Sequence, residues 1–436
     1  MRRLTIATVV AVLLASCGAA DETAATNPST TSVGPTETTV PFQTGDLVSL
    51  DVPRQTPSVT DAEIAAVVRG DAALGLDLLR VAAGDENLMI SPYSIATALS
   101  MLYPGAKGQT ADEIAAVLHL EVPDETLHAV RNAIEAALAA EPPSIPSDDR
   151  EPFTIRPANS AWGQGGYPFL DEYLEVLATQ YGAGLRLLDF VNDAGGATET
   201  INGWVEDATE DRIKDLIPEG AINALTRLVL ANAIWFKANW ADQFDPEMTT
   251  VDPFTLATGE EISVPTMHGN ILTGYVANDL LEAVRLPYAG DAAMVVAVPK
   301  TGSLADLVNA ITVDDLGIEW ESYQVAVSLP SFEFEAELAL KAALQELGLA
   351  DVFDPARADL TGITAARELF VSDAFHKTFV AVDETGTEAA AATAVIVGLT
   401  AAPEPATFTA DQPFLFWIEH SSTGEMLFLG QVTDPR

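Results

Sequence analysis

The order in which helical and extended segments follow one another constrains the fold of this chain more than any other feature of its sequence. Capping patterns mark three expected helix starts, at Thr60–Glu63, Ser91–Pro92 and Thr110–Glu113. After about residue 225 the apolar segments are instead typical of strands, many of them buried on both faces. These predicted strands are 228–236, 294–298, 323–327 and 414–418. Helices followed by strands, with few alternations, predict an α+β fold with large sheets.

The composition is that of a folded and strongly acidic protein. Of its 436 residues 48% are hydrophobic, and 21 Lys and Arg stand against 64 Asp and Glu, which gives a net charge of −43. Such a protein repels phosphate groups, so nucleic acid is an unsuitable partner, and heparin-like polyanions are disfavoured for the same reason. Five His and one Cys are too few for a zinc-finger type of site, and we expect no metal or cofactor.

Motifs of catalysis are missing from the sequence. It contains no G-x-S-x-G, no H-E-x-x-H, no Walker loop and no G-x-G-x-x-G. The His residues are scattered, and no pair of carboxylates stands out as an acid and base. We therefore expect no catalytic residues and no enzymatic activity.

The N-terminus has the pattern of an export signal. Arg2 and Arg3 precede an apolar stretch, 4–14, that is too short to span a bilayer. It ends in Leu-Ala-Ser before Cys17, which resembles a bacterial lipobox: residues 1–16 would be removed as a lipoprotein signal peptide and Cys17 would receive lipid. The alternative is an ordinary secretory signal with an accidental Cys. Because Cys17 is the only Cys of the chain, the fold has no disulfide.

Two further regions follow the signal. Residues 17–57 are rich in Thr, Pro, Ser and Glu, without helical or strand periodicity, and predict a disordered tether. Residues 58–436 continue without another low-complexity break and predict one folded domain. We therefore expect an exported protein, anchored to the cell membrane through its lipid alone and facing the extracellular or periplasmic space.

One segment near the C-terminus, 383–401, does not fit ordinary core structure. Its four consecutive alanines favour a helix, whereas the strand pattern 379–382 leads into it and Gly386 interrupts it. This segment resembles the hinge of the serpins, the serine protease inhibitor superfamily, and is close to the consensus of the inhibitory members. The hinge residues are Glu384, Gly386, Thr387, Glu388, Ala389, Ala390, Ala391, Ala392 and Thr393.

The resemblance covers about 61–436. Its other motifs follow in family order: Asn87 with Ser91, Pro92 and Ser94; 232–240; 329–332; 359–363; 376–377; 411–416; and 428–432. It implies one domain of three β-sheets and eight or nine helices, with an exposed reactive loop. It also implies a suicide mechanism, in which a protease cuts the loop, is held as an acyl-enzyme, and is displaced when the loop inserts into a central sheet.

The alternation of side chains in the hinge supports such an insertion. Every second residue from Thr387 is small or β-branched: Thr387, Ala389, Ala391, Thr393, Val395 and Val397. None of them is charged and none is Pro, while Glu388 falls on the opposite face. Fourteen inserted residues would extend roughly 45 Å.

The resemblance assigns supporting roles to residues outside the loop. Ser91, Ser94, Asn232 and His376 match the family's polar cluster beneath the central sheet, which makes His376 a hydrogen-bonded core residue. Trp240 and Glu384 match the region where insertion begins. Ser331 stands where the family commonly has Lys, which leaves the partner of Glu384 open.

Counting forward from Glu384 by the family's usual loop length places the reactive bond at Thr400–Ala401, with Leu399 as an alternative. Counting back from Pro413 gives Ala402–Pro403, a bond that proteases cut poorly. Small or aliphatic residues here exclude trypsin-like targets and favour elastase-, subtilisin- or chymotrypsin-like serine proteases.

Three other functions remain open: a non-inhibitory serpin-fold binding protein, an inhibitor of cysteine proteases, and a solute-binding lipoprotein. The hinge disfavours the last of these. We expect the chain to act as a monomer.

Overall fold

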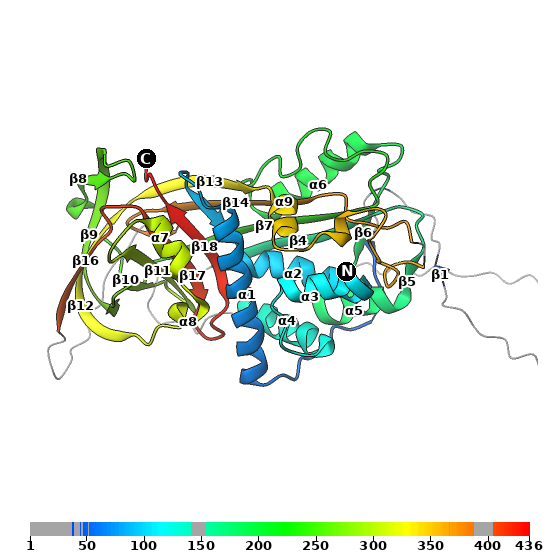
Figure 1. The fold of residues 1–436 in the computed structure, drawn as a ribbon, viewed down its shortest axis with the longest axis horizontal. Helices are drawn as coiled ribbons and strands as arrows, with labels where there is room; N and C mark the ends of the chain where they lie inside the picture. Colours follow the sequence, from blue (N-terminus) through cyan, green and yellow to red (C-terminus); the bar gives the residue numbers. More distant parts are fainter. Residues whose placement is uncertain are drawn as a thin grey trace, which may run out of the picture. The chain divides into compact units, whose positions relative to one another are not determined.

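A computed structural model describes residues 37–38, 44, 47–50, 52–140, 154–365, 367–387 and 404–436. Residues 37–436 form one compact unit (Figure 1). The part of the chain that is described contains nine α-helices and three sheets, in agreement with the three sheets and eight or nine helices that the resemblance implies.

The α-helices are α1 (Asp61–Ala82), α2 (Pro92–Leu102), α3 (Gly108–Val117), α4 (Asp124–Leu138), α5 (Asp171–Tyr181), α6 (Ala194–Ala208), α7 (Leu304–Ala310), α8 (Val313–Leu316) and α9 (Leu340–Glu346). Two of the three predicted helix starts are confirmed. Thr60 and Glu63 form the capping box of α1, and the Ser91 hydroxyl accepts from the Ser94 amide at the start of α2.

The predicted start of the third helix is wrong. Helix α3 begins at Gly108, with Lys107 at its N-cap, so Thr110 lies inside the first turn. The Thr110 hydroxyl instead accepts from the backbone of Asp359, and the Glu113 carboxylate accepts from the amides of Ala350 and Asp351. Both side chains of the expected capping box are therefore used by a segment distant in sequence.

The strands are β1 (Glu37–Thr38), β2 (Leu47–Val48), β3 (Leu88–Ile90), β4 (Thr154–Gln164), β5 (Phe169–Leu170), β6 (Leu185–Leu188), β7 (Leu228–Asn239), β8 (Thr250–Thr255), β9 (Glu261–Ala277), β10 (Leu281–Pro287), β11 (Ala292–Pro299), β12 (Glu321–Pro330), β13 (Phe332–Leu338), β14 (Ala374–Val382), β15 (Gly386–Thr387), β16 (Pro405–Thr409), β17 (Phe414–His420) and β18 (Met426–Val432). The four strands predicted from the sequence lie within β7, β11, β12 and β17.

A seven-stranded sheet has the order β13-β14-β15-β7-β4-β6-β2. Helix α6 covers one face of this sheet, where it packs with Val229, Ala231 and Ala233 of β7 (Figure 1). Helix α2 covers the other face, in the core that holds Leu230, Ile234 and the other buried even-numbered residues of β7. The period of two along β7 thus divides its side chains between two hydrophobic cores.

A nine-stranded sheet follows the path β16-β12-β9-β10-β11-β17-β18-β3, with β8 paired to β9. The last strand of the chain, β18, is buried along its whole length and lies between β17 and β3. The Asn87 side chain, just before β3, accepts from the amides of Thr433 and Asp434 and donates to the Asp434 carbonyl. The chain's last residues are therefore fixed to one of its first strands.

Part of the stretch expected to be a tether belongs to the folded unit. Strand β2 pairs with β6 at the edge of the seven-stranded sheet, and β1 pairs with β5. Further on, the Arg54 guanidinium donates to Glu135 and to Asn132 on α4. Hydrogen bonds to distant elements order these residues, although their composition carries no periodic signal.

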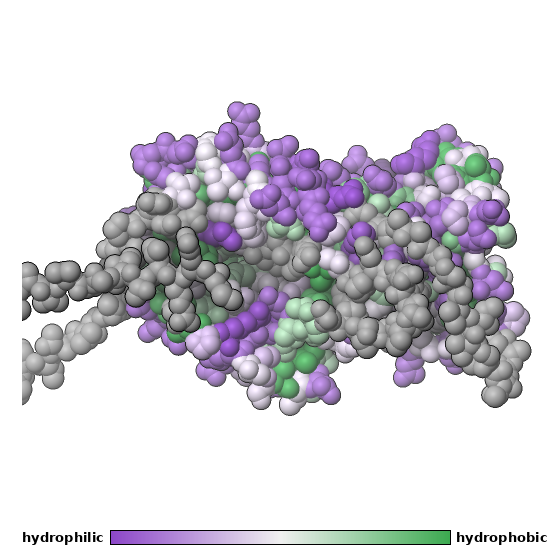
Figure 2. Space-filling view, turned by 180° about the vertical axis from the view of Figure 1, so that it is seen from behind, coloured by the Kyte–Doolittle hydropathy of each residue, from purple (hydrophilic) through white to green (hydrophobic). Residues whose placement is uncertain are grey.

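On the face seen in Figure 2, the described residues are predominantly hydrophilic, and hydrophobic residues form only small patches between them. Among the residues that the structure describes, the large exposed hydrophobic side chains are Leu47, Val52, Val191, Leu225, Met248, Val251 and Leu272. Among the described helices, none has the length and apolar character needed to cross a bilayer.

Candidate functional site

The chain leaves β14 through a tight turn that sends it back beside the strand. The Asp383 carboxylate accepts from the amides of Thr385 and Gly386, at 2.8 and 3.1 Å, and the Asp383 amide donates to the Gly386 carbonyl at 2.9 Å. These hydrogen bonds reverse the direction of the chain, so that β15 (Gly386–Thr387) runs antiparallel to β14. The predicted hinge thus begins inside the seven-stranded sheet, between β14 and β7.

Glycine is required at the first position of β15. A Cβ atom on Gly386 would lie 2.1 Å from the Ala238 carbonyl oxygen and 2.7 Å from the Asn239 Cα. Both contacts are with backbone atoms of β7, which cannot rotate away. Any side chain at residue 386 would therefore push β15 out of its place.

Thr387 is the first hinge side chain to enter the core, and it is only 2% exposed. It pairs with Val382 of β14 and with Ala238 of β7, and its hydroxyl lies 2.7 Å from the Tyr288 hydroxyl. Burial raises the pKa of Tyr288 above its usual range, so this phenol keeps its proton. The two hydroxyls satisfy each other inside an otherwise apolar region.

Trp240 holds the turn from the end of β7. Its indole stacks on Tyr288, with ring centroids 4.5 Å apart and planes 7° apart, and its Nε1 donates to the Asp383 carbonyl at 2.9 Å. Its amide donates to the Thr385 carbonyl at 2.9 Å, and the Gln243 side chain donates to the same oxygen at 3.1 Å. These contacts fix the backbone that precedes β15.

The carboxylate of Glu384 accepts a hydrogen bond of 2.6 Å from the Thr249 hydroxyl. Ser331 stands where the family commonly has Lys, and its backbone amide donates a hydrogen bond to the Pro265 carbonyl. A neutral hydroxyl group therefore partners Glu384 in this chain, and Thr249 is a site residue that the sequence did not reveal.

A second polar cluster lies beneath the same sheet. The Ser91 amide donates to His376 Nε2 at 3.0 Å, the Ser91 hydroxyl donates to the Leu427 carbonyl at 2.6 Å, and the Ser94 amide donates to the Ser91 hydroxyl at 3.2 Å. Burial lowers the pKa of His376 to about 3, so the imidazole is neutral and its Nε2 accepts. Asn232 is opposite His376 in the β14–β7 ladder, but its side chain lies outside the description.

Below β15 the two neighbouring strands close and pair directly. Residues Ala374–Thr378 of β14 are parallel to Leu230–Ile234 of β7. Thr387 pairs with Val382 of β14 and with Ala238 of β7. The offset in residue number between these two partners is the same as in the direct β14–β7 pairs. Opening this ladder for another strand requires lateral separation of β14 and β7 but no sliding.

These features match a known family. A family model described as serpin (serine protease inhibitor) matches residues 70–435. The chain belongs to the serpin family. An uncharacterised serpin-like protein of Thermococcus kodakarensis is 34% identical over 445 residues, which cover 100% of this serpin and 99% of the relative. The leukocyte elastase inhibitor of Homo sapiens is 36% identical over 363 residues, covering 80% and 93%.

Solved serpin structures resemble the fold closely. The native state of tengpin, a thermophilic serpin, superposes with a TM-score of 0.77 at 25% identity, covering 90% of this chain and all of that one. Uncleaved ovalbumin gives a TM-score of 0.74 at 28% identity, covering 85% and 100%. The serpin fold expected from the sequence is thereby confirmed.

The remaining predicted positions of this serpin lie outside the described residues. They are Cys17, Glu388, Ala389, Ala390, Ala391, Ala392, Thr393, Leu399, Thr400 and Ala401. Within the described ranges no group of three or more His, Cys, Asp or Glu side chains could hold a metal ion.

Proposed function

We propose that this serpin inhibits serine proteases as a suicide substrate, by inserting its cleaved loop between β14 and β7. The observation that carries the proposal is β15: Thr387 is already seated in the sheet and hydrogen-bonded to Tyr288. Because β14 and β7 have the same offset at Thr387 and along the ladder where they pair directly, β15 can lengthen as the two strands separate, without either strand sliding past the other.

The register assigns a place to each residue that would follow Thr387. Continuing both antiparallel ladders puts Thr393 between His376 and Asn232. Ala238 and Val382 belong to the core on the α2 side, so the residues at every second position from Thr387 face that core. Their small or β-branched side chains suit it, and no charge would be buried there.

In the proposed reaction the protease's serine oxygen attacks the Thr400 carbonyl, and the amine of Ala401 leaves. The ester that joins protease and serpin then moves with the inserting strand before water can cleave it. Leu399 is the alternative position of attack. Small and aliphatic residues favour elastase-, subtilisin- or chymotrypsin-like enzymes, and the human relative at 36% identity carries the name of an elastase inhibitor. We infer that the inhibitor acts as a monomer and without a cofactor.

The deciding experiment mixes the protein with an elastase-type protease and looks for a complex that survives SDS. Mass spectrometry of the released peptide should give Ala401 as its first residue. Thr387→Arg would place a charge in the buried position beside Tyr288, at a cost of several kcal/mol. The variant should be cut about as fast as wild type, because the attacked bond is distant, but should form little complex.

Thr385→Arg is the matched control, since Thr385 carries the same side chain two residues earlier, in the half-buried turn outside β15. It should retain most of the complex. A wild-type protein that is cut without any stable complex would instead be a non-inhibitory serpin-fold binding protein. Complexes formed only with cysteine proteases would change the target class.

We further propose that the protein is a bacterial lipoprotein, exported and tethered to the membrane through lipid on Cys17. The support is the lipobox-like sequence that precedes Cys17, the only Cys of the chain. The signal peptide would be 1–16, and the folded domain would face the extracellular or periplasmic space.

A further inference from the structure

Three ionisable side chains meet in the core next to the hairpin that joins β17 to β18. They are Asp71 of α1, Arg131 of α4 and Glu425, which directly precedes β18. Asp71 and Arg131 are at most 2% exposed, and Glu425 is not exposed at all. Helix α1 packs on both α4 and β18 (Figure 1), so this buried cluster lies where α1 connects α4 with the last hairpin of the chain.

Asp71 and Arg131 already satisfy each other. The Arg131 guanidinium donates to both Asp71 oxygens, with 2.6 Å between Nη2 and Oδ1, and its Nε donates to the Ser100 hydroxyl of α2 at 3.1 Å. One cation therefore balances one carboxylate. Because Arg does not lose its proton in proteins, the charge of this pair is fixed, and a second carboxylate beside it has no cation of its own.

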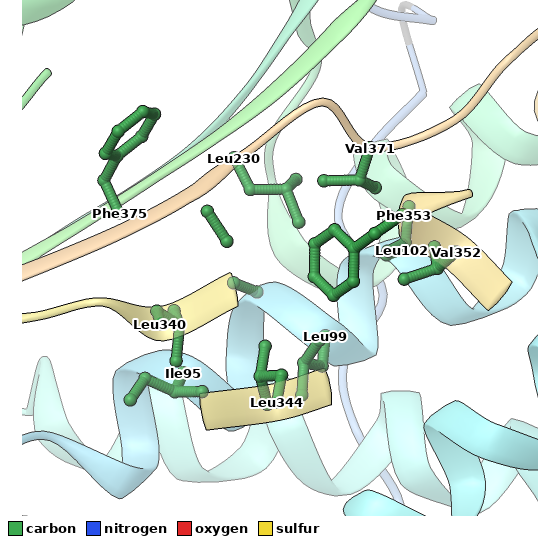
Figure 3. Close-up of a pocket in the computed structure, with 12 residues that line it drawn as sticks. Ile95, Leu99, Leu102, Leu230, Leu340, Leu344, Val352, Phe353, Val371 and Phe375 are labelled. Carbon is green, nitrogen blue, oxygen red and sulfur yellow. The ribbon is translucent and has the colours of Figure 1, made fainter. Parts of the chain in front are cut away.

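The other side of α2 offers no polar group that could compensate a charge. Figure 3 shows Ile95 and Leu99 on the side of α2 that faces the seven-stranded sheet, in a pocket with Leu230 of β7 and Leu344 of α9. All the side chains that line this pocket are hydrophobic. The polar side chains of α2 near the cluster lie on its opposite side.

The titratable groups around the cluster carry no balancing charge near pH 7. The Glu135 carboxylate of α4 pairs with Arg54. Burial raises the pKa of the neighbouring phenols and lowers the pKa of the neighbouring imidazoles, which keeps both kinds of group neutral. They are Tyr93 of α2, Tyr181 of α5, His128 of α4 and His420 of β17.

Glu425 is therefore a carboxyl group without a counter-charge. Neither of its side-chain oxygens has a hydrogen-bond partner at normal distance in the described part of the structure. Burial raises its pKa well above the usual range, and the charge of the neighbouring Asp71 raises it further. An ionised Glu425 would leave an unbalanced charge in the core, whereas a protonated one carries a donor that Asp71 can accept.

We propose that Glu425 is held as the neutral acid and donates its proton to Asp71, and that this makes the contact between α1 and the β17–β18 hairpin sensitive to alkali. Loss of the proton leaves two carboxylates side by side with one guanidinium between them. Their repulsion, together with the cost of a buried charge, then favours separation of the hairpin from α1. The proposal concerns the folded body and does not depend on the inhibitory function.

The direction of the pH dependence follows from which state binds the proton. In the unfolded chain the pKa of Glu is about 4.3. Above this value the unfolded state has released the proton, whereas the folded state retains it up to the raised pKa of Glu425. The contribution of Glu425 to stability is therefore complete below about pH 4.3 and is lost as the pH rises. The equilibrium constant of unfolding increases about tenfold per pH unit on account of this group.

The test measures unfolding by denaturant between pH 7 and 8.5, above the usual pKa of His. Glu425→Gln keeps the shape of the side chain and a donor for Asp71, but it has no proton to lose. Relative to this variant, the wild-type protein should lose stability as the pH rises, by about tenfold in the unfolding constant per pH unit. The infrared spectrum at pH 7 gives a second readout: the wild type should show the C=O band of a carboxylic acid, and Glu425→Gln should lack it.

Glu419→Gln is the matched control. Glu419 belongs to the same hairpin, but its carboxylate accepts a hydrogen bond of 2.8 Å from the Arg285 guanidinium, which balances its charge. This variant should keep the wild-type slope and the infrared band, even if it is less stable throughout. Equal slopes for wild type and Glu425→Gln, or a wild-type spectrum without the acid band, would overturn the proposal and leave the inhibitory function untouched.

Discussion

At the scale of single residues, His376 combines complete burial with a hydrogen bond that only a neutral imidazole can accept. Its Nε2 accepts the Ser91 amide, and burial lowers its pKa to about 3. In the unfolded chain the pKa of His is about 6.5. Between these values the unfolded state binds the proton and the folded state does not. The stability that this neutral group maintains is present above about pH 6.5 and is lost as the pH falls toward 3.

We therefore expect the free energy of unfolding to decline with acidification by about 1.4 kcal/mol per pH unit for this group alone. Burial also lowers the pKa of His128, to about 4, so this residue adds to the same decline. His376→Gln should flatten the slope measured by denaturant titration between pH 6.5 and 4, although the variant is less stable throughout. His128→Gln should flatten the lower part of the slope in the same way, because burial lowers the pKa of that imidazole as well. Equal slopes in all three proteins would contradict this explanation.

At the scale of elements, the two residues of β15 determine how far the sheet is open. They separate β14 from β7 at one end, while the ladder from Ala374 to Thr378 remains closed. Three groups on other segments hold β15 and the turn before it: the Tyr288 hydroxyl contacts Thr387, and the Trp240 indole and the Gln243 amide donate to carbonyls of the turn. The strand is short, so each of these contacts carries a large share of its stability.

Tyr288→Phe should loosen β15, because it leaves the buried Thr387 hydroxyl without its partner, at a cost of about 1–3 kcal/mol. Hydrogen–deuterium exchange of a peptide spanning 383–387 should accelerate. Adding Thr387→Val removes the orphaned hydroxyl and should recover part of the loss. Tyr275→Phe, which removes a hydroxyl bonded to Glu282 on the nine-stranded sheet, should leave exchange in 383–387 unchanged. Equal exchange in the Tyr288 and Tyr275 variants would show that the hydroxyl pair does not hold the strand.

The sequence predicted the elements better than their contacts. The caps at Thr60 and Ser91 join residues three apart, so a local pattern is sufficient to predict them. The partners of the hinge are distant: Tyr288 is 99 residues from Thr387, and Thr249 is 135 residues from Glu384. No periodicity links such positions. The same limit explains the wrong helix start at Thr110, whose hydroxyl is used by Asp359, 249 residues away.

At the scale of the whole molecule, the strong negative charge affects how the protein could be held at a membrane. Its net charge of −43 repels anionic lipid headgroups, and the sequence has no basic cluster beyond Arg2 and Arg3, which would leave with the signal peptide. Membrane attachment would therefore depend on the lipid at Cys17.

Cys17→Ser should accordingly move the protein from the membrane fraction to the soluble fraction, because no other feature of the tether binds lipid. Fractionation of cells followed by immunoblotting would measure this shift. Ser16→Ala, a change between small residues beside the cleavage site, should stay with the membrane. Equal solubility and processing of wild type and Cys17→Ser would rule out the lipoprotein proposal.

The position of β18 has a consequence for how the protein is made. This strand lies between β17 and β3, so a strand from the first quarter of the chain waits for a partner that is synthesised last. While the C-terminus is still within a ribosome or an export channel, β3 has no neighbour in its sheet and Asn87 has no terminal residues to bind. We therefore expect the nine-stranded sheet to be completed at β3 only after β18 has emerged. If the protein is exported, as proposed above, such a delay would help it to cross the membrane before its core closes.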